Sequence, residues 1–488
     1  MSDRPRICFN AIVKNEEAVI LRCLKSFAPW CDTWCIVDTG STDRTMELIT
    51  NFFAEQKMEG QLHSRPWVDF EFNRNEALDL ARAMLGPEDY CLCADADEEL
   101  TTQAGFKLPS PMTATKYDVA IEHGCTFHRP RFYQAYKYSW AYPTHEALLP
   151  EKGVIEYTVY LDKILIKSYT DGARAKDAAR WLRDAASLDA AIAVRERGEL
   201  WRGRELQLSR LYFYSGNSYY HAGAYEKALE QYTHRIKINE FDQETFQAYY
   251  MMAKVKMDMK KDRETIMGAF LQAYAFRPSR YEPIYHLIKY LMDNGDYEVA
   301  RLFADRMLTA EIPGDTLFVE KWAYAEGKRL ARILLKPTPS DSIQLATQQY
   351  LHKRWTGVLE TLKPLKLKTL SVDEKFTYFD LSFIAHSWLG KRADAIAMLK
   401  RITEMPLKHW KRHVYRLFSY YVNVYKEPLE SLPREVQLEY LIQEAQVKKK
   451  DEQTVEKPTT AEDPSVKPTT TEESSVKPEV SSEASTVS

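Results

Sequence analysis

Short apolar runs alternate with segments of helical length over the first 94 residues of the chain. The runs with the length and composition of buried strands are Ile7–Val13, Trp34–Asp38 and Tyr90–Ala94. The segments with helical periodicity between them are Glu17–Phe27, Asp43–Gln56 and Asn73–Leu85. This alternation is typical of a mostly parallel sheet with helices on both faces. The sequence therefore predicts an α/β domain of Rossmann-like form at the N-terminal end.

The most polar short segments of this region directly follow the expected strands. They are AIVKNEE, VDTGSTD and ADADEE. In open α/β sheets the ligand binds beyond the carboxyl ends of the strands, where the connecting loops converge. The position of the three segments therefore indicates a nucleotide site at this edge of the sheet.

Two carboxylates separated by one residue, Asp95 and Asp97, follow the third apolar run and precede Glu98. Side chains placed in this way bind a hard divalent cation through oxygen. Such a cation bridges a pyrophosphate and balances the charge of a departing nucleoside diphosphate. An acidic turn after a strand is also common without a metal, and it is the neighbouring segments that favour the metal site.

The segment after the second run combines a turn glycine with two hydroxyl residues. Gly40 permits a tight turn, and Ser41 or Thr42 is expected to cap the next helix. Any connection from a strand to a helix uses such residues. Asp38 is more informative, because a carboxylate at the strand tip accepts hydrogen bonds from a base N–H or a ribose hydroxyl.

From about residue 174 to residue 425 the pattern becomes almost wholly helical. The similar amphipathic segments that begin with glycine-containing or basic turns are Ala222–Tyr232, Asn294–Ala304 and Leu389–Leu399. Gly223 and Gly295 are separated by close to two periods of a tetratricopeptide-type repeat of about 34 residues. Stacked helical hairpins are expected, although the segment 314–370 fits this period poorly.

Length and charge limit the number of domains and the kinds of partner. A chain of 488 residues exceeds the roughly 250–300 residues of a single core. The expected parts are an α/β domain at 1–172, a helical domain at 173–445 and a disordered tail, poor in aromatic residues, at 446–488. A net charge of -3 gives no overall basic field for nucleic acid, which is therefore not an expected partner.

Neither a secretory leader nor a membrane span is expected. The start of the chain has no apolar core of signal-peptide length, and no stretch approaches the roughly 18 apolar residues of a spanning helix. The seven cysteines lie near the N-terminal end and are expected to be reduced, buried thiols. Cys31 and Cys35 lack a second pair at zinc-site spacing. The sequence predicts a cytoplasmic protein.

Five segments together resemble the family 2 glycosyltransferases of GT-A fold, in particular a subgroup that joins a short catalytic domain to tetratricopeptide-like helices. They are IVKNEE (Ile12–Glu17), VDTGSTDRT (Val37–Thr45), RNEAL (Arg74–Leu78), DADEE (Asp95–Glu99) and THE (Thr144–Glu146). The resemblance continues at Tyr212–Ile236 and Phe276–Leu287 and covers roughly residues 6 to 305. It implies an inverting transferase that takes a sugar from a nucleotide-diphosphate donor, a UDP sugar, with the help of Mn²⁺ or Mg²⁺.

The resemblance also implies a role for each matched position. The residues that would bind the donor are Asn15 or Glu16, Asp38, Arg74 and Asp95. Asp38 would line the nucleoside pocket, and Arg74 would face the base or the phosphates. Asp95 would contact the ribose or the metal, and Asp97 of the DXD motif would be the principal metal ligand.

An inverting displacement requires a carboxylate on the acceptor side that takes the proton of the acceptor hydroxyl or thiol. Glu146 lies where the family has this base, and the adjacent His145 would assist the phosphates or bind the metal. The plain alternative is that both residues belong to a surface turn. Glu98 or Glu99 is then the reserve base.

One segment departs from the subgroup. Its members often have a histidine after the last strand of the catalytic domain, where this chain has Ser168 and Tyr169 in KILIKSYTDG. The loss implies a metal held by fewer protein ligands, a weaker activity or a different alignment of this segment.

The segment Phe127–Tyr142 is dense in aromatic and basic residues. Aromatic faces stack on sugar rings and arginines bind phosphate or carboxylate, so this segment is a candidate acceptor cleft with Arg129 and Arg131 as its binding residues. Interleaved aromatic residues also pack an ordinary domain edge, and both interpretations stay open.

Two other functions fit parts of the sequence, and no motif identifies the acceptor as a protein, a glycan or a lipid. One is a scaffold whose helical repeats bind a peptide or protein partner and whose acidic motif is vestigial. The other is a nucleotidyltransferase, which would need a glycine-rich, basic phosphate loop after the first strand. AIVKNEE has neither feature, so this function ranks last.

Overall fold

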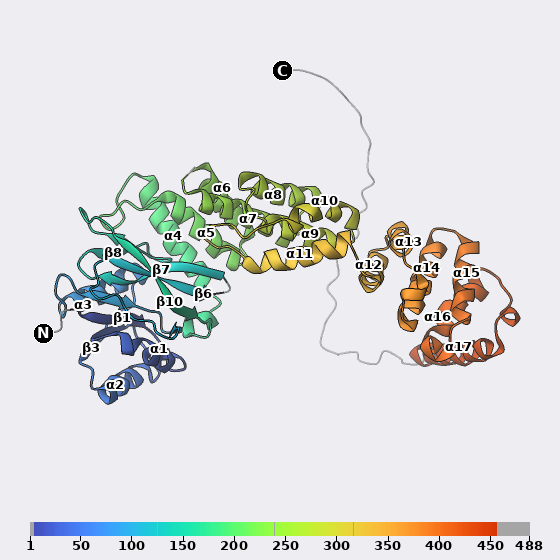
Figure 1. Cartoon of the computed structure of the whole chain (residues 1–488), viewed down its shortest axis with the longest axis horizontal. Coiled ribbons are helices and arrows are strands. Elements are labelled where there is room, and N and C mark those ends of the chain that lie inside the picture. Colours follow the sequence, from blue (N-terminus) through green and yellow to red (C-terminus); the bar gives the residue numbers. More distant parts are fainter. Residues whose placement is uncertain (1–3, 124, 239, 316, 456–488) are drawn as a thin grey trace, which may run out of the picture. The chain divides into compact units, whose positions relative to one another are not determined.

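The computed structural model describes residues 4–123, 125–238, 240–315 and 317–455 (Figure 1). Contacts divide the chain into two compact units, one up to Asp341 and one from Ser342 onward. The first unit contains a β-sheet with its covering helices and then an array of helices, and the described part of the second unit is helical. None of the described helices is long and apolar enough to cross a membrane.

An eight-stranded mixed sheet forms the centre of the N-terminal half of the first unit. Its strands are β1 (Ile7–Val13), β2 (Thr33–Asp38), β3 (Gly60–Ser64), β4 (Tyr90–Cys93), β5 (Glu98–Thr102), β6 (Lys116–His123), β7 (Cys125–Gln134) and β10 (Thr158–Ser168). They lie in the order β3-β2-β1-β4-β7-β6-β10-β5. The first four strands are parallel, which confirms the α/β prediction, whereas β7 and β5 pair antiparallel with their neighbours. A separate hairpin contains β8 (Tyr138–Ala141) and β9 (Ala147–Pro150).

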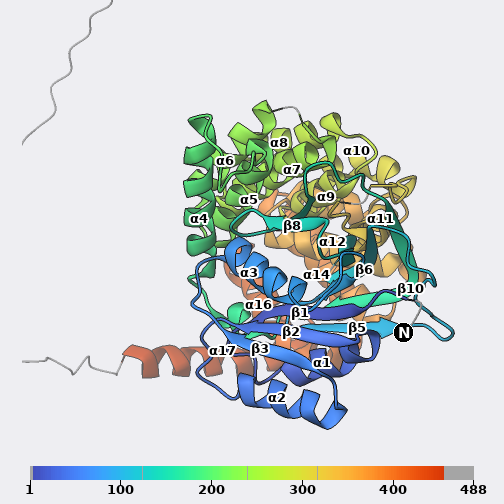
Figure 2. The same cartoon turned by 90° about the vertical axis from the view of Figure 1, so that its left-hand side faces the viewer.

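Helices cover both faces of this sheet, as the sequence predicts. They are α1 (Ile20–Phe27) and α2 (Thr45–Gln56) on one face and α3 (Phe70–Arg82) on the other (Figure 2). The alternation of β1 explains the two layers, because successive side chains of a strand point to opposite faces. Phe9 packs against Phe27 of α1, whereas Cys8 lies in a second core with Leu78 of α3. Cys8, Cys23, Cys31, Cys35, Cys91 and Cys93 are free thiols, and five of these six are buried, as expected.

Helix α2 begins later than expected and without a hydroxyl cap. Its N-cap is Arg44, which makes no side-chain capping hydrogen bond, so the predicted caps are wrong. Ser41 Oγ instead accepts a hydrogen bond from the backbone N–H of Asn15 at 2.8 Å, and the Thr42 N–H donates to Asn15 Oδ1 at 2.7 Å. The hydroxyl residues therefore tie the loop after β2 to the loop after β1.

The aromatic segment around β7 contributes to both cores. β7 pairs antiparallel with β4 and β6, and its successive residues Phe132 and Tyr133 enter the cores on opposite faces of the sheet. The sequence pattern does not separate the strands between residues 98 and 168, because they carry polar residues among the apolar ones and three of the six have only four or five residues. Some aromatic side chains of the segment Phe127–Tyr142 therefore pack in the interior of the domain.

The first unit continues as paired helices joined by tight turns, which confirms the TPR-like prediction (Figure 1). The helices are α4 (Arg180–Glu196), α5 (Leu208–His221), α6 (Tyr225–Lys237), α7 (Asp242–Asp258), α8 (Arg263–Phe276), α9 (Glu282–Asp293), α10 (Tyr297–Leu308) and α11 (Lys321–Leu335). Gly223 and Gly295 form the turns of the pairs α5–α6 and α9–α10 with φ of 75° and 73°. These are left-handed conformations that glycine adopts without steric cost. Lys260 occupies the turn between α7 and α8 with φ 52°.

The loop between α4 and α5 fastens the helical array to the sheet domain. Trp201 Nε1 donates a hydrogen bond to Glu71 Oε2 of α3 at 2.8 Å. Arg202 pairs with Asp69, the N-cap residue of the same helix. The predicted boundary between residues 172 and 173 therefore lies inside one compact unit.

The second unit contains the remaining helices. They are α12 (Pro339–Leu351), which begins just before the division, α13 (Trp355–Leu362), α14 (Val372–Trp388), α15 (Arg392–Thr403), α16 (Val414–Ser419) and α17 (Arg434–Val455). Gly390 forms the turn between α14 and α15 with φ 71°. Helix α17 continues through residues 446–455, where the tail was expected to begin. Residues 456–488 of that tail lie outside the described residues.

We expect Gly223→Ala to destabilise the array and Gly268→Ala to stabilise it. At Gly223 the φ of 75° would place alanine in the left-handed region, at a cost of about 1–2 kcal/mol. Gly268 lies inside α8 with nothing within 4 Å of an added Cβ, so alanine should increase the free energy of unfolding by about 0.5–1 kcal/mol. Thermal unfolding followed by circular dichroism measures both. Midpoints that shift in the same direction would contradict this description of the turn.

Candidate active site

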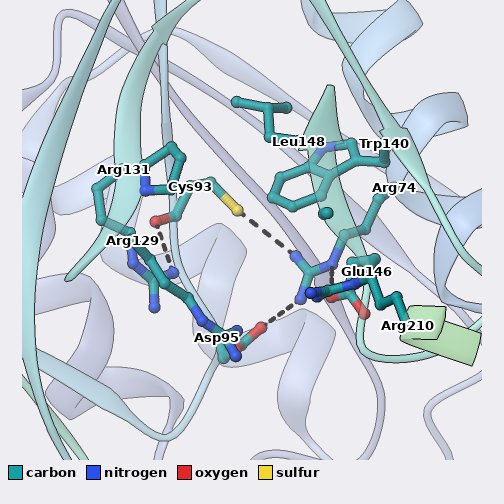
Figure 3. A pocket seen from close by; sticks show the side chains of 11 residues that line it. Arg74, Cys93, Asp95, Arg129, Arg131, Trp140, Glu146, Leu148 and Arg210 are labelled. Carbon is teal, nitrogen blue, oxygen red and sulfur yellow. Dashed lines mark hydrogen bonds and ion pairs between the residues drawn. The ribbon is translucent and has the colours of Figure 1, made fainter. Parts of the chain in front are cut away.

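Arg74 joins three segments that lie far apart in the chain (Figure 3). Its Nη2 donates to Asp95 Oδ1 at 2.5 Å, and its Nε donates to Glu146 Oε1 at 2.6 Å. Its Nη1 lies 3.5 Å from Cys93 Sγ. Arg74 belongs to α3, Asp95 follows β4, and Glu146 precedes β9. The structure thus brings together three residues that the sequence identified as candidates.

These ion pairs set the charge of Asp95. Loss of water raises the pKa of this carboxyl, but the attraction of Arg74 and Arg131 outweighs that effect and lowers the pKa to about 2. Arg74 is only 7% exposed, whereas the side chain of Asp95 is 47% exposed. A charged carboxylate is therefore held at the rim of the site by a buried guanidinium.

A cavity of about 200 Å³ lies beside this network. It is lined by Arg74, Cys93, Asp95, Arg129, Pro130, Arg131, Trp140, Glu146, Ala147, Leu148 and Arg210. Trp140 and Leu148 form its apolar wall, and the guanidinium of Arg74 lies 5.1 Å from the centroid of the Trp140 ring. A wall that combines an aromatic face with charged groups suits a sugar or another polar ligand.

Asp97 lies in a second, acidic part of the site. Burial raises the pKa of Asp97 to about 7, and the negative charges of Asp95, Glu98 and Glu16 add to this effect. Gly172 brings the segment after β10 close to these carboxylates, since a Cβ at this position would lie 3.1 Å from Glu16 Oε2 and 3.4 Å from Asp97 Cβ. The acidic side chains therefore repel one another.

The chemistry of these carboxylates suits a hard divalent cation. Oxygen ligands of this kind bind Mg²⁺ and Mn²⁺, and a cation would relieve the repulsion that raises the pKa of Asp97. However, no three His, Cys, Asp or Glu side chains among the described residues gather closely enough to hold a metal ion. Asp95 and Asp97 would therefore hold a cation together with oxygens from the donor or from water.

His145 does not join the two aspartates in such a group. Its ring stacks on Tyr214 of α5 with centroids 4.4 Å apart, and its enclosed Nε2 meets no hydrogen-bond partner in the part of the chain that is described. Burial and the positive charges of Arg129 and Arg210 lower the pKa of His145 to about 3. The imidazole is therefore neutral at physiological pH.

Helix α5 holds the turn that carries His145 and Glu146. Tyr142 and His145 have φ of 78° and 52°, which are uncommon for residues with side chains. Arg210 Nη2 donates to the His145 carbonyl at 3.0 Å, and the Gln207 N–H donates to the Tyr142 hydroxyl at 3.3 Å. The side chain of Glu146 is only 14% exposed, so a plain surface turn does not describe this segment.

Asp38 is buried and shapes its own turn. Its Oδ2 accepts hydrogen bonds from the N–H groups of Gly40 and Ser41, both at 3.0 Å. Its Oδ1 is enclosed and has no partner among the described groups. Asn15 is likewise engaged with Thr42 in the neighbouring loop. Contact of Asp38 or Asn15 with a nucleoside stays a prediction.

Arg131 and the reserve base Glu98 are paired with each other. Arg131 Nη2 donates to Glu98 Oε1 at 2.5 Å, and the two side chains are 7% and 3% exposed. Glu98 Oε2 also accepts a hydrogen bond from the Asp95 N–H at 2.9 Å. This pair supports the loop of Asp95. Arg129, two residues before Arg131 on β7, is exposed and lines the cavity.

The segment that has Ser168 and Tyr169 in place of a histidine lies beside the acidic cluster. The Tyr169 N–H donates to the carbonyl of Asp97 at 3.3 Å, and the hydroxyl of Tyr169 donates to Glu99 Oε2 at 2.7 Å. The guanidinium of Arg22 lies 4.1 Å from the centroid of the tyrosine ring. Tyr169 thus stands next to the DXD motif and also engages the second reserve base.

Some residues of the cavity carry no sequence signal. Arg210 lies two residues before the segment Tyr212–Ile236 that resembles the subgroup, but it is not part of that segment and no motif includes it. Trp140 belongs to the aromatic segment of the expected acceptor cleft, and this density was the only signal for it. Leu148 is an ordinary apolar residue of a short strand.

Comparison with known proteins gives one family and one curated relative. The model of glycosyl transferase family 2 matches residues 11–151. A TPR repeat-containing protein of Synechococcus elongatus is 36% identical over 101 residues, which are 21% of this chain and 23% of the relative. The match therefore spans less than a quarter of that relative.

Solved structures with similar chains share little sequence. Residues 1–349 of S. aureus TarS are 13% identical, with 67% of this chain and 90% of that one covered and a TM-score of 0.24. The same TarS segment has also been solved in complex with UDP-GlcNAc. The C-terminal part of a TPR repeat-containing protein from Cytophaga hutchinsonii is 10% identical, with 46% and 90% covered and a TM-score of 0.24.

We expect Arg74→Met to lower the free energy of unfolding by about 1–3 kcal/mol, because Glu146 loses its partner in a largely buried position. Adding Glu146→Gln to this variant should restore part of the loss, since a neutral amide costs less to bury than a carboxylate. Urea unfolding of wild type, the two single variants and the double variant gives the coupling energy. Strictly additive losses would show that the ion pair contributes no interaction energy.

Proposed function

Residues 11–151 belong to glycosyl transferase family 2, and from this premise we propose that the chain transfers a sugar from a nucleotide-diphosphate donor to a protein, glycan or lipid acceptor. The proposed donor is a UDP sugar, and the proposed transfer inverts the anomeric carbon and requires Mn²⁺ or Mg²⁺. The observation that carries the proposal is the network of Arg74, Asp95 and Glu146, which borders one cavity.

On the donor side, Asp95 and Asp97 would hold the cation, with Glu16 and Glu98 as neighbouring carboxylates. The cation, when bound, balances charge on the leaving diphosphate. Arg74 holds the Asp95 carboxylate in place by a hydrogen bond of 2.5 Å. The loops that contain Asn15 and Asp38 are tied to each other and would form the nucleoside pocket.

On the acceptor side, Glu146 is the proposed base. In-line attack requires a carboxylate that takes the proton of the acceptor as the new bond forms. Arg74 fixes the direction of this carboxylate, and helix α5 fixes the turn that carries it. The ring of Trp140 offers a face on which a sugar of the acceptor or donor can stack. The neutral His145 beside the base adds no charge to the site.

A scaffold with weak or no catalysis is the second candidate. One observation favours it: the described residues contain no group of three metal-binding side chains. The resemblance to the subgroup implies, in addition, a histidine where this chain has Ser168 and Tyr169. The paired helices α5–α10 would then bind a peptide or protein partner. For either function we propose a cytoplasmic location, because six of the seven cysteines are free thiols.

We expect the purified chain to release UDP from one member of a panel of UDP sugars when Mn²⁺ or Mg²⁺ is present. Asp97→Asn should lower this release at least about 100-fold, because it removes the charge that holds the cation. Asp79→Asn is the matched control, since Asp79 is 68% exposed on α3, pairs with Arg82 and does not line the cavity. No release from any donor, with binding of UDP retained, would favour the scaffold.

We expect Glu146→Gln to abolish transfer and to spare binding of UDP. The amide preserves the shape and the hydrogen bond from Arg74 but cannot take a proton, and loss of a general base lowers rates by about 10²–10⁴-fold. Initial rates with the active donor and calorimetric titration of UDP separate the two effects. Full activity of this variant would exclude Glu146 as the base and direct the same test to Glu99.

A further inference from the structure

Four arginine side chains line the cavity beside the proposed base, and carboxylates within the site neutralise two of them. Arg74 pairs with Asp95 and Glu146. Arg131 pairs with the buried carboxylate of Glu98. These two guanidinium groups have their partners and hold the site together.

The other two arginines, Arg129 and Arg210, are incompletely neutralised. Arg129 is exposed, and within the described residues its guanidinium makes no ion pair and lies 5.2 Å from the centroid of the Phe127 ring. Arg210 lies 3.6 Å from Glu244, a carboxylate that Arg235 also approaches at 3.5 Å. Because one carboxylate serves two arginines, a positive charge remains at this wall of the cavity.

Arg210 also binds the backbone next to the proposed base, because its Nη2 donates to the His145 carbonyl at 3.0 Å. Both arginines line the same cavity. The nearby carboxylate of Glu146 is engaged with Arg74, and that of Glu244 is shared between two arginines. The described carboxylates therefore balance this wall only in part.

We propose that this wall binds an anionic group of the acceptor, a phosphate or a carboxylate, between Arg129 and Arg210. Guanidinium groups are the side chains best suited to such groups, because their planar donors bind two oxygens at once. The acceptor hydroxyl would lie at Glu146, and the anionic group of the same acceptor molecule would point toward α5. The inference rests on the proposed function, since it names the substrate class of the same site.

The proposal gives the helical array a direct part in substrate selection. Arg210 is a residue of α5, and its side chain reaches the cavity formed mainly by residues of the sheet domain (Figure 3). Through Arg210, the helical array would then bind the acceptor inside the cavity, next to the proposed base.

The diphosphate of the donor is also an anion that arginines bind. Competition with UDP distinguishes a site for the acceptor from a site for the donor diphosphate. We would titrate the full chain with glucose 6-phosphate and with glucose as its neutral match, each with and without saturating UDP and Mg²⁺. Glucose 6-phosphate should bind at least about tenfold more tightly than glucose, and UDP should not displace it.

Substitutions assign the binding to the two arginines. Arg129→Gln and Arg210→Gln should each weaken binding of glucose 6-phosphate about tenfold, and Arg210→Lys should weaken it less, because lysine keeps the charge but loses the planar pair of donors. Arg197→Gln is the matched control, since Arg197 is 56% exposed and pairs with Glu199 outside the cavity. The exposed position of Arg129 keeps the test valid if the substitution in α5 unfolds the chain.

Equal affinities for glucose 6-phosphate and glucose, or unchanged affinity in both glutamine variants, would overturn the proposal. Displacement of glucose 6-phosphate by UDP would also overturn it and would assign the arginines to the donor diphosphate. A chain that binds glucose 6-phosphate through these arginines but does not bind UDP would support the anion site and contradict the proposed transferase.

Discussion

The two ion pairs of Arg74 are the interaction on which the site depends. One buried guanidinium reaches the end of β4 and the turn before β9, so a single side chain sets the separation of Asp95 and Glu146. Other contacts support this arrangement from outside. Arg131 and Glu98 brace the loop of Asp95, and helix α5 braces the turn of Glu146. A substitution at any of these supporting residues would therefore change the distance between Asp95 on the donor side and Glu146 on the acceptor side.

The parts of the fold that repeat a local pattern were predictable from the sequence. The bounds of β1 were predicted to the residue, because a strand in a parallel sheet is buried on both faces and its run is apolar except for Asn10. The turn glycines of the helical array were predictable because few other residues adopt their backbone conformation. Strands β5 to β10 were not predicted, since β5, β8 and β9 are short and the longer β6, β7 and β10 mix polar with apolar residues without a regular period.

The residues of the site also divide into those that the sequence predicted and those whose contacts it could not predict. Arg74, Asp95 and Glu146 belong to segments that resemble a known family, and the structure brings them together. Their neighbours depend on contacts between distant segments, which no local pattern encodes. Asp38 uses one carboxylate oxygen for its own turn, and Arg131 is engaged by Glu98. Sequence reasoning identified these side chains as polar and well placed, but it could not show which partners they already have.

The bond from Trp201 to the buried Glu71 has a consequence for how such proteins can diversify. Helices α8 to α11 contribute no residue to the lining of the cavity. We expect these helices to tolerate changes in length with little effect on the site. Helices α4, α5 and α7 are less free to change, because the loop between α4 and α5 anchors α3, α5 holds the turn before β9, and Glu244 of α7 pairs with Arg210. The sheet domain and these first helices would therefore vary together, and independent variation would begin beyond α7.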